Sequence, residues 1–168
     1  MDSPNPRRDG FTLMELLVVM MLVTIVLAVT VPRFGSGLMQ DPKKQLSRWV
    51  INTTRALRTE AMEKQTVHAL VIDLDNNRMW TVHAGMDEEA LSAAAEKAFS
   101  LPGAIRLANV HFANEERAAS GTTEILFHPA GYADQALIHV EHRTAGRFSF
   151  QVEPLLPKVR LLEGWVTY

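Results

Sequence analysis

The sequence predicts an α+β fold in which a long N-terminal helix packs against an antiparallel β-sheet domain. Two observations predict it. A mostly apolar run at 11–31 leads into a helical pattern that reaches about residue 65, and the rest of the chain alternates between β-rich segments and turn signals. With 168 residues and 18.8 kDa, the chain can form one domain with a modest core. We therefore divide it into a polar segment at 1–10, a long helix at 11–65 and a β-rich domain at 66–168.

The run at 11–31 has the length and composition of a transmembrane helix. Its single ionisable side chain is Glu15. At a rise of about 1.5 Å per residue, the run spans roughly 30 Å, the thickness of a bilayer hydrocarbon core. Arg7 and Arg8 precede it and no basic cluster follows at once. We therefore expect a single-pass membrane protein whose N-terminus is cytoplasmic and whose globular domain lies outside the cytoplasm.

A second stretch of helix is predicted after a break. Pro32 removes one backbone hydrogen bond and is expected to kink or end the first stretch. The helical pattern resumes at about Pro42 and should end near Lys64, with charged residues mostly off its apolar stripe. The stripe itself consists of Leu46, Trp49, Val50, Thr53, Leu57 and Ala61.

The remaining segments are read from their turn signals and alternation. Segments 66–74 and 78–83 flank an Asp-Asn-Asn turn and predict a hairpin. Asp87 is a plausible N-cap for a short helix over 87–99. One or two strands are expected within 104–112 and single strands at 124–128, 136–143 and 147–152, with a polar loop at 113–121 and weaker strands at 159–162 and 165–168.

Composition excludes several kinds of function. The chain has no cysteine, so disulfides and thiolate sites are impossible. Its net charge is −2 and stays so without residues 1–10, which does not favour binding of nucleic acid. There is neither a nucleophile elbow nor a glycine-rich phosphate loop. We therefore expect no enzyme and no cofactor.

Two groups of possible metal ligands are disfavoured. His139 and His142 lie on opposite faces of an alternating strand, so they cannot easily share an ion. Segment 73–84 has suitable side chains at the first three ligand positions of an EF-hand loop. However, Arg78 stands where that loop needs glycine and Ala84 where it needs glutamate. We expect a hairpin turn there and no metal site.

Glu15 is the feature of the apolar run that needs an explanation. A charge inside a membrane costs at least about 2.5–3.5 kcal/mol and marks a functional residue by default. The run contains no basic side chain. A cut after Gly10 would create an ammonium group on Phe11, which could meet Glu15 of a neighbouring subunit. An ordinary signal peptide, a plain anchor or a twin-arginine signal fits less well, because the run is long and contains Glu15.

The segment GFTLMELLVV at 10–19 resembles the class III signal of type IV pilins and type II secretion pseudopilins. The resemblance implies that a prepilin peptidase cuts after Gly10, that Phe11 becomes the N-methylated N-terminus, and that Glu15 guides assembly. Pro32 falls where these families often have a helix-kinking proline. Asp9 departs from the usually basic leader and could slow processing.

The rest of the chain resembles the GspH/FimT family of minor pseudopilins and minor pilins. The resemblance lies in the segments LRTEA at 57–61, 65–74 and FHPAG at 127–131, and it covers most of 10–152. It implies a pilin-like structural subunit whose partners are the prepilin peptidase/methyltransferase, other major and minor pilins or pseudopilins, and an inner-membrane assembly platform. We expect a minor pseudopilin that helps to initiate or connect the tip of a type II secretion pseudopilus. The alternative is a minor pilin of a type IV pilus, acting in pilus assembly or DNA uptake.

Overall fold

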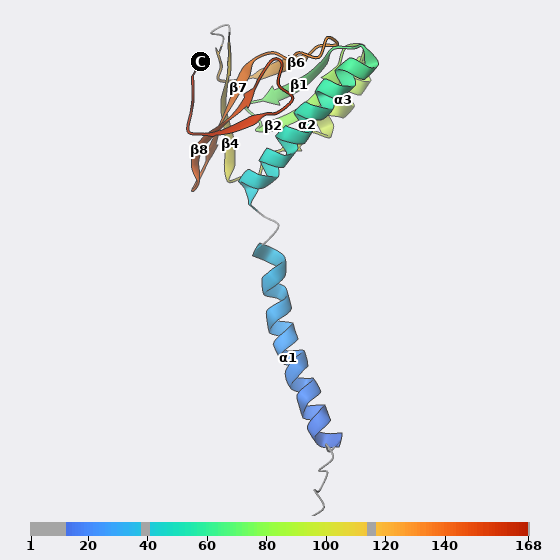
Figure 1. Ribbon diagram of the computed structural model, residues 1–168, viewed down its shortest axis with the longest axis vertical. Helices are drawn as coiled ribbons and strands as arrows, with labels where there is room; N and C mark the ends of the chain where they lie inside the picture. Colours follow the sequence, from blue (N-terminus) through green and yellow to red (C-terminus); the bar gives the residue numbers. More distant parts are fainter. Residues whose placement is uncertain (1–12, 38–40, 114–116, 168) are drawn as a thin grey trace, which may run out of the picture. The chain divides into compact units, whose positions relative to one another are not determined.

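The computed structural model describes residues 13–37, 41–113 and 117–167, and it leaves out the side chains of 27–37 (Figure 1). The chain divides into two compact units, Met1–Asp41 and Pro42–Tyr168. The first unit contains helix α1, Leu13–Gly37. This helix continues through Pro32, so the proline does not end it, and the predicted kink stays a prediction. Over the described residues, no helix has both the length and the hydropathy needed to cross a membrane.

The surface of α1 is apolar and exposed. Every described side chain from Leu13 to Val26 is exposed, including the large apolar ones. Thr24 is satisfied within the helix, because its hydroxyl donates to the Met20 carbonyl at 2.7 Å. An exposed apolar surface of this extent is typical of a segment that becomes buried in a partner or a membrane.

The second unit begins with α2, Pro42–Lys64, at both ends as the sequence predicts. Proline suits the first position of a helix, where its missing N–H has no intrahelical acceptor. The buried face of α2 comprises Leu46, Val50, Thr54, Leu57, Arg58 and Ala61. Thr54 thus replaces the expected Thr53, and Arg58, expected off the stripe, is buried. A single helix over 11–65 stays a prediction, since residues 38–40 lie outside the described part.

The first sheet has four antiparallel strands in the order β3-β2-β1-β6. The predicted hairpin is confirmed, with His68 opposite His83 and Asp73 opposite Arg78. Every residue of β1 is buried, and α2 packs on β1 and β6. The strands are β1 His68–Asp73, β2 Arg78–His83, β3 Phe99–Ser100 and β6 Thr122–Phe127.

The remaining strands form a second antiparallel sheet, in the order β5-β4-β7-β8-β9 (Figure 1). The single expected sheet is therefore two, because β7 pairs with β4 and not with β6. The polar loop expected at 113–121 contains the short strand β5. The strands are β4 Ile105–Phe112, β5 Arg117–Ala118, β7 Ala136–His142, β8 Gly146–Val152 and β9 Arg160–Glu163.

Two predictions at the edges of the second unit have opposite outcomes. Helix α3, Glu88–Glu96, has the predicted N-cap, since Asp87 Oδ1 accepts from the Ala90 N–H at 2.8 Å. The strand expected at 165–168 is wrong over the described residues 165–167. The chain leaves β9 at Gly164, whose φ of 78° lies in the left-handed region that suits glycine.

One hydrophobic core joins α2 to both sheets. It combines Leu46 and Leu57 of α2 with Phe127 of β6 and with Phe148 and Phe150 of β8. All of these side chains are at most 3% exposed. The described core lies entirely within 42–168, so the second unit has the buried apolar surface of an independent domain.

Candidate functional site

Of the predicted processing and assembly residues, the structure describes only Glu15. Gly10 and Phe11 fall outside the described residues. Glu15 lies in the first turn of α1 and is exposed, where the partial positive charge of a helix N-terminus favours a carboxylate. Glu15 is thus an acidic group on a mostly apolar helix surface.

Arg58 of α2 makes three hydrogen bonds to loops that follow β6 and β8. Its Nη1 donates to the carbonyls of Gly131 and Pro154, both at 2.7 Å, and its Nη2 donates to the Glu153 carbonyl at 2.8 Å. The side chain is 7% exposed. Burial lowers the pKa of Arg58, but a guanidinium remains charged in proteins, so these are hydrogen bonds from a cation.

The turn that receives Arg58 is shaped by glycine. Gly131 has a φ of +88°, and a Cβ there would lie 3.0 Å from Met62 Sδ of α2. The turn is closed by the Tyr132 carbonyl, which accepts from the His128 N–H at 2.8 Å, and by the stacked rings of these two residues, whose centroids are 4.2 Å apart. The segment FHPAG at 127–131 therefore forms the docking point for α2.

The burial of Arg58 had a detectable signal in the sequence. It follows Thr54 by four residues and precedes Ala61 by three, so it lies on the buried stripe. Its charge led to the opposite expectation. Three backbone carbonyls from two separate loops compensate that charge, and such long-range partners are not visible in a local pattern.

A second buried polar cluster covers the outer face of the β4-β7-β8 sheet. His139 is 4% exposed; its Nδ1 lies 2.8 Å from Asn109 Oδ1 and its Nε2 lies 2.9 Å from the Val166 carbonyl. Trp165 stacks on the His139 ring at 5.6 Å, and the Arg147 guanidinium lies 4.3 Å from the Trp165 ring. The C-terminal segment expected to form a strand thus covers this face instead.

The two histidines of β7 do not act together. His139 is held by Asn109 and Val166, whereas His142 Nδ1 accepts from the Thr144 and Ala145 N–H groups in the β7–β8 turn at 3.2 and 2.9 Å. The two rings thus have separate partners, and the absence of a shared ion stays a prediction.

Stability should fall on acidification because of His139. Burial lowers its pKa, the Val166 carbonyl opposes this, and the charges of His111 and Arg117 lower it further. The unfolded chain, in which a histidine has a pKa of about 6.5, therefore binds more protons than the folded chain. Stability is complete above this value and decreases as the pH falls toward the folded pKa.

We expect the urea midpoint of the domain to be lower at about pH 5 than at about pH 7.5, with a smaller difference in His139→Gln. Burial also lowers the pKa of His68. This residue should therefore account for part of the pH dependence that remains in His139→Gln. An unchanged pH dependence in His139→Gln would contradict this assignment.

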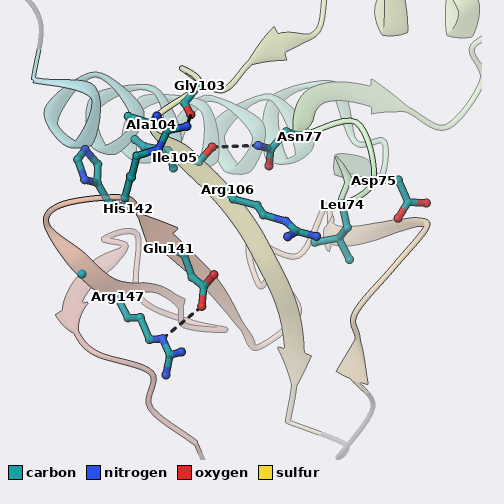
Figure 2. A pocket seen from close by; sticks show the side chains of 12 residues that line it. Leu74, Asp75, Asn77, Gly103, Ala104, Ile105, Arg106, Glu141, His142 and Arg147 are labelled. Atoms are coloured by element: carbon teal, nitrogen blue, oxygen red, sulfur yellow. Dashed lines mark hydrogen bonds and ion pairs between the residues drawn. The ribbon is translucent and has the colours of Figure 1, made fainter.

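One cleft in the second unit is open and of mixed charge. It has a volume of about 630 Å³ and lies between the β1–β2 turn, β4 and the β7–β8 hairpin (Figure 2). Arg147 Nε donates to Glu141 Oε1 at 3.2 Å across part of it, and Arg106 extends along it. None of the described lining residues is Ser, Thr, Cys or Lys. Its lining does include Asp75, Glu141 and His142.

The predicted hairpin turn at 73–78 is confirmed, and its side chains are occupied. Asp73 accepts from the Asn76 backbone N–H and side-chain amide at 2.9 Å each, and from Arg78 Nη2 at 3.1 Å. Asn77, at a φ of 58°, bonds β4 through the Ile105 carbonyl and the Leu107 N–H. Among the described residues there is no group of three or more His, Asp or Glu placed to hold a metal ion.

Comparisons with known proteins bear on the N-terminal segment and on the folded domain. Residues 5–31 match the prokaryotic N-terminal methylation motif. No curated protein sequence matches the chain. A structure of the minor pseudopilin EpsH from the type 2 secretion system of Vibrio cholerae is similar with a TM-score of 0.55, at 12% identity over 76% of this chain and 100% of that chain. A crystal structure of the same protein is similar with a TM-score of 0.51, at 13% identity over 76% of this chain and 98% of that chain. The chain thus combines a prepilin-type N-terminus with the fold of a minor pseudopilin.

Proposed function

We propose that this chain is a minor pseudopilin of the type II protein secretion system, a structural subunit that helps to initiate or connect the tip of the periplasmic pseudopilus. One combination supports this proposal best. A methylation motif at 5–31 precedes a β-rich domain whose fold is similar to that of a minor pseudopilin. Neither feature alone would separate a pseudopilin from another anchored domain.

Maturation starts at the N-terminus. A prepilin peptidase cuts after Gly10, and a methyltransferase modifies the new amine of Phe11. Glu15 of one subunit then pairs with the Phe11 ammonium of a neighbour as their helices pack together. The exposed apolar surface of α1 supports this role, because it can be buried in a membrane before assembly and in a filament core afterwards.

The subunit sits in the inner membrane before assembly. We infer this from the run at 11–31, with its single ionisable side chain, and from Arg7 and Arg8 before it, which favour a cytoplasmic N-terminus. The domain 66–168 then lies in the periplasm. Its partners are other major and minor pseudopilins and the inner-membrane assembly platform.

The role is structural and not catalytic. The cleft between the β1–β2 turn, β4 and the β7–β8 hairpin presents arginines paired or interspersed with acids. The buried Arg58 and His139 hydrogen-bond the chain's own backbone. These groups stabilise the fold.

The proposal is tested by complementing a host strain that lacks the gene. We expect restored export of folded proteins by the type II system, with unchanged type IV pili. Mass spectrometry of the N-terminal peptide from the same cells should show a mature chain starting at N-methylated Phe11.

The two measurements answer different questions. Mass spectrometry tests whether the chain is a pilin-like protein, and complementation tests whether it serves a secretion system or a pilus. An intact leader, or a cut beyond Ala28, would remove the ammonium that Glu15 needs and would contradict the pseudopilin class. The chain would instead be assigned to a type IV pilus if it is processed correctly but the strain that lacks the gene secretes normally and has lost pili or DNA uptake.

A further inference from the structure

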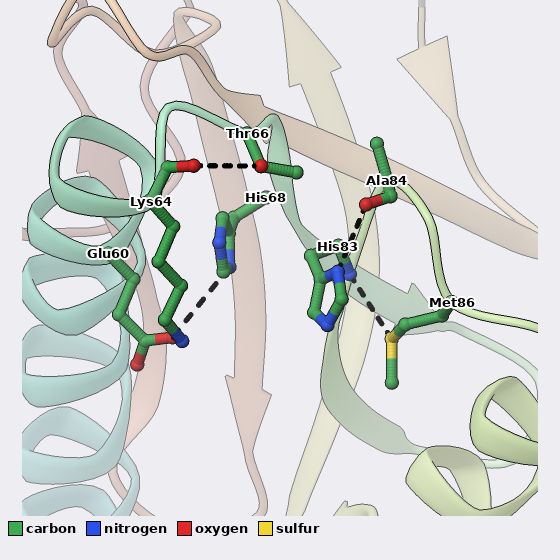
Figure 3. A network of polar contacts seen from close by, with 7 residues as sticks. All are labelled: Glu60, Lys64, Thr66, His68, His83, Ala84 and Met86. Atoms are coloured by element: carbon green, nitrogen blue, oxygen red, sulfur yellow. Dashed lines mark hydrogen bonds and ion pairs between the residues drawn. The ribbon is translucent and has the colours of Figure 1, made fainter.

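The hairpin register brings two distant histidines together. His68 begins β1 and His83 ends β2, and the antiparallel pairing places them directly opposite each other. Their ring centroids are 5.3 Å apart with an interplanar angle of 41°. Figure 3 shows the two rings on neighbouring strands, with Glu60 and Lys64 of α2 beside His68, and Ala84 and Met86 beside His83.

The Nδ1 atom of each ring faces an oxygen that only accepts hydrogen bonds. His83 Nδ1 lies 3.0 Å from the Ala84 carbonyl, so this nitrogen carries the hydrogen and Nε2 keeps its lone pair. His68 Nδ1 lies 3.9 Å from Glu60 Oε2, a carboxylate held in place by Lys64 Nζ at 2.6 Å. The carboxylate likewise favours the hydrogen of a neutral His68 on Nδ1.

The other nitrogen of His68 has no partner. His68 is 3% exposed, and its Nε2 is buried without a hydrogen bond to any described residue. A buried polar atom left unsatisfied is rare and usually indicates a bound water or ion. A pocket of about 290 Å³ lies beside it, lined among others by His83, Glu60, Thr81 and Met86. His68 and His83 both line this pocket.

We propose that His68 and His83 form a binding site for one divalent transition-metal ion, with Zn²⁺ as the reference ion and one Nε2 from each ring as ligand. Imidazole is a good ligand for Zn²⁺ and its neighbours in the series. Metal-binding histidines almost always present their second nitrogen to a carbonyl or carboxylate, which Ala84 and Glu60 provide. Two protein ligands leave the other positions to solvent, and His83, which is exposed, gives the ion access from outside.

The site would link three elements. His68 lies on β1, His83 on β2, and the outer partner Glu60 on α2. A bound ion would therefore connect the open end of the hairpin to the last turns of the helix. This inference does not depend on the proposed function, because it rests only on groups within the second unit.

The test uses the full-length chain purified in detergent and titrated with Zn²⁺ in a calorimeter. We expect one ion per chain and a saturable rise in thermal unfolding temperature. His68→Gln and His83→Gln should each bind at least about tenfold more weakly, since losing an outer partner alone costs 10–100-fold. His128→Gln, which removes a histidine that pairs with Asp134 elsewhere, should bind as the parent does.

The exposed His83 keeps the test decisive if the buried His68→Gln variant fails to fold. Circular dichroism should show that His83→Gln retains the fold. With Cu²⁺ as a second probe, electron paramagnetic resonance should show two nitrogen ligands in the parent and one in His83→Gln. Absence of Zn²⁺ binding in the parent, or unchanged binding in His83→Gln, would overturn the proposal and leave a water as the partner of His68.

Discussion

Replacing Glu15 by leucine is expected to leave membrane insertion and leader cleavage intact and to abolish incorporation of the subunit into filaments. The carboxylate costs about 2.5–3.5 kcal/mol within an apolar span, so its removal should favour insertion. The proposed cleavage follows Gly10, five residues before Glu15 in the sequence, and we expect it not to need that carboxylate. Assembly is the step that requires an opposite charge, because the Phe11 ammonium of a neighbour would otherwise be buried unpaired, at a cost of several kcal/mol.

The measurement is the fraction of processed subunit in sheared filaments, compared with the fraction left in the membrane. Thr24→Leu is the matched control, because it replaces a polar side chain of the same helix whose hydroxyl bonds its own backbone. It should assemble normally. Glu15→Asp should recover part of the incorporation into filaments, because it keeps the negative charge. Normal filaments from Glu15→Leu would refute the pairing of Glu15 with the terminal amine.

Replacing Arg58 by methionine is expected to lower the free energy of unfolding of the domain by about 3–5 kcal/mol. Each hydrogen bond to a charged group contributes about 1.5–3 kcal/mol, and partial relaxation of the loops recovers some of the three that are lost. Because small domains have only about 5–15 kcal/mol of stability, this change removes a large share of it.

Urea unfolding of a fragment covering 42–168, which contains the described core, measures this change. Arg55→Met is the control, because Arg55 lies one turn earlier on α2 and is exposed. It should change stability by less than about 0.5 kcal/mol. Arg58→Lys should be intermediate, since a single ammonium cannot reproduce the fork of a guanidinium. Equal effects of Arg58→Met and Arg55→Met would show that the three carbonyls contribute nothing.

Local patterns predicted the elements whose causes are local. The limits of α2, the 66–83 hairpin and the Asp87 cap follow from periodicity, turn residues and side-chain chemistry within a few positions. The pairing of His68 with His83 also follows from the hairpin, once its turn is placed between Asp73 and Arg78. In this case the signal was present and was not used.

Features that depend on distant segments were not predictable in the same way. The division into two sheets depends on β7 pairing with β4, thirty residues earlier, and not with β6. The burial of His139 depends on a C-terminal segment that alternates like a strand but covers the sheet face instead. The processing site could be assigned only by resemblance, and Gly10 and Phe11 lie outside the described residues.

The contacts of Arg58 have a mechanical consequence. Gly131 follows β6 of one sheet, and Glu153 and Pro154 follow β8 of the other. The Pro154 carbonyl also accepts from the Ala133 N–H at 3.0 Å, which ties the two loops to each other. A force along α2 would therefore pass through the Arg58 guanidinium to both sheets at once. The two sheets would bear the load together. Neither sheet would have to separate from the helix alone.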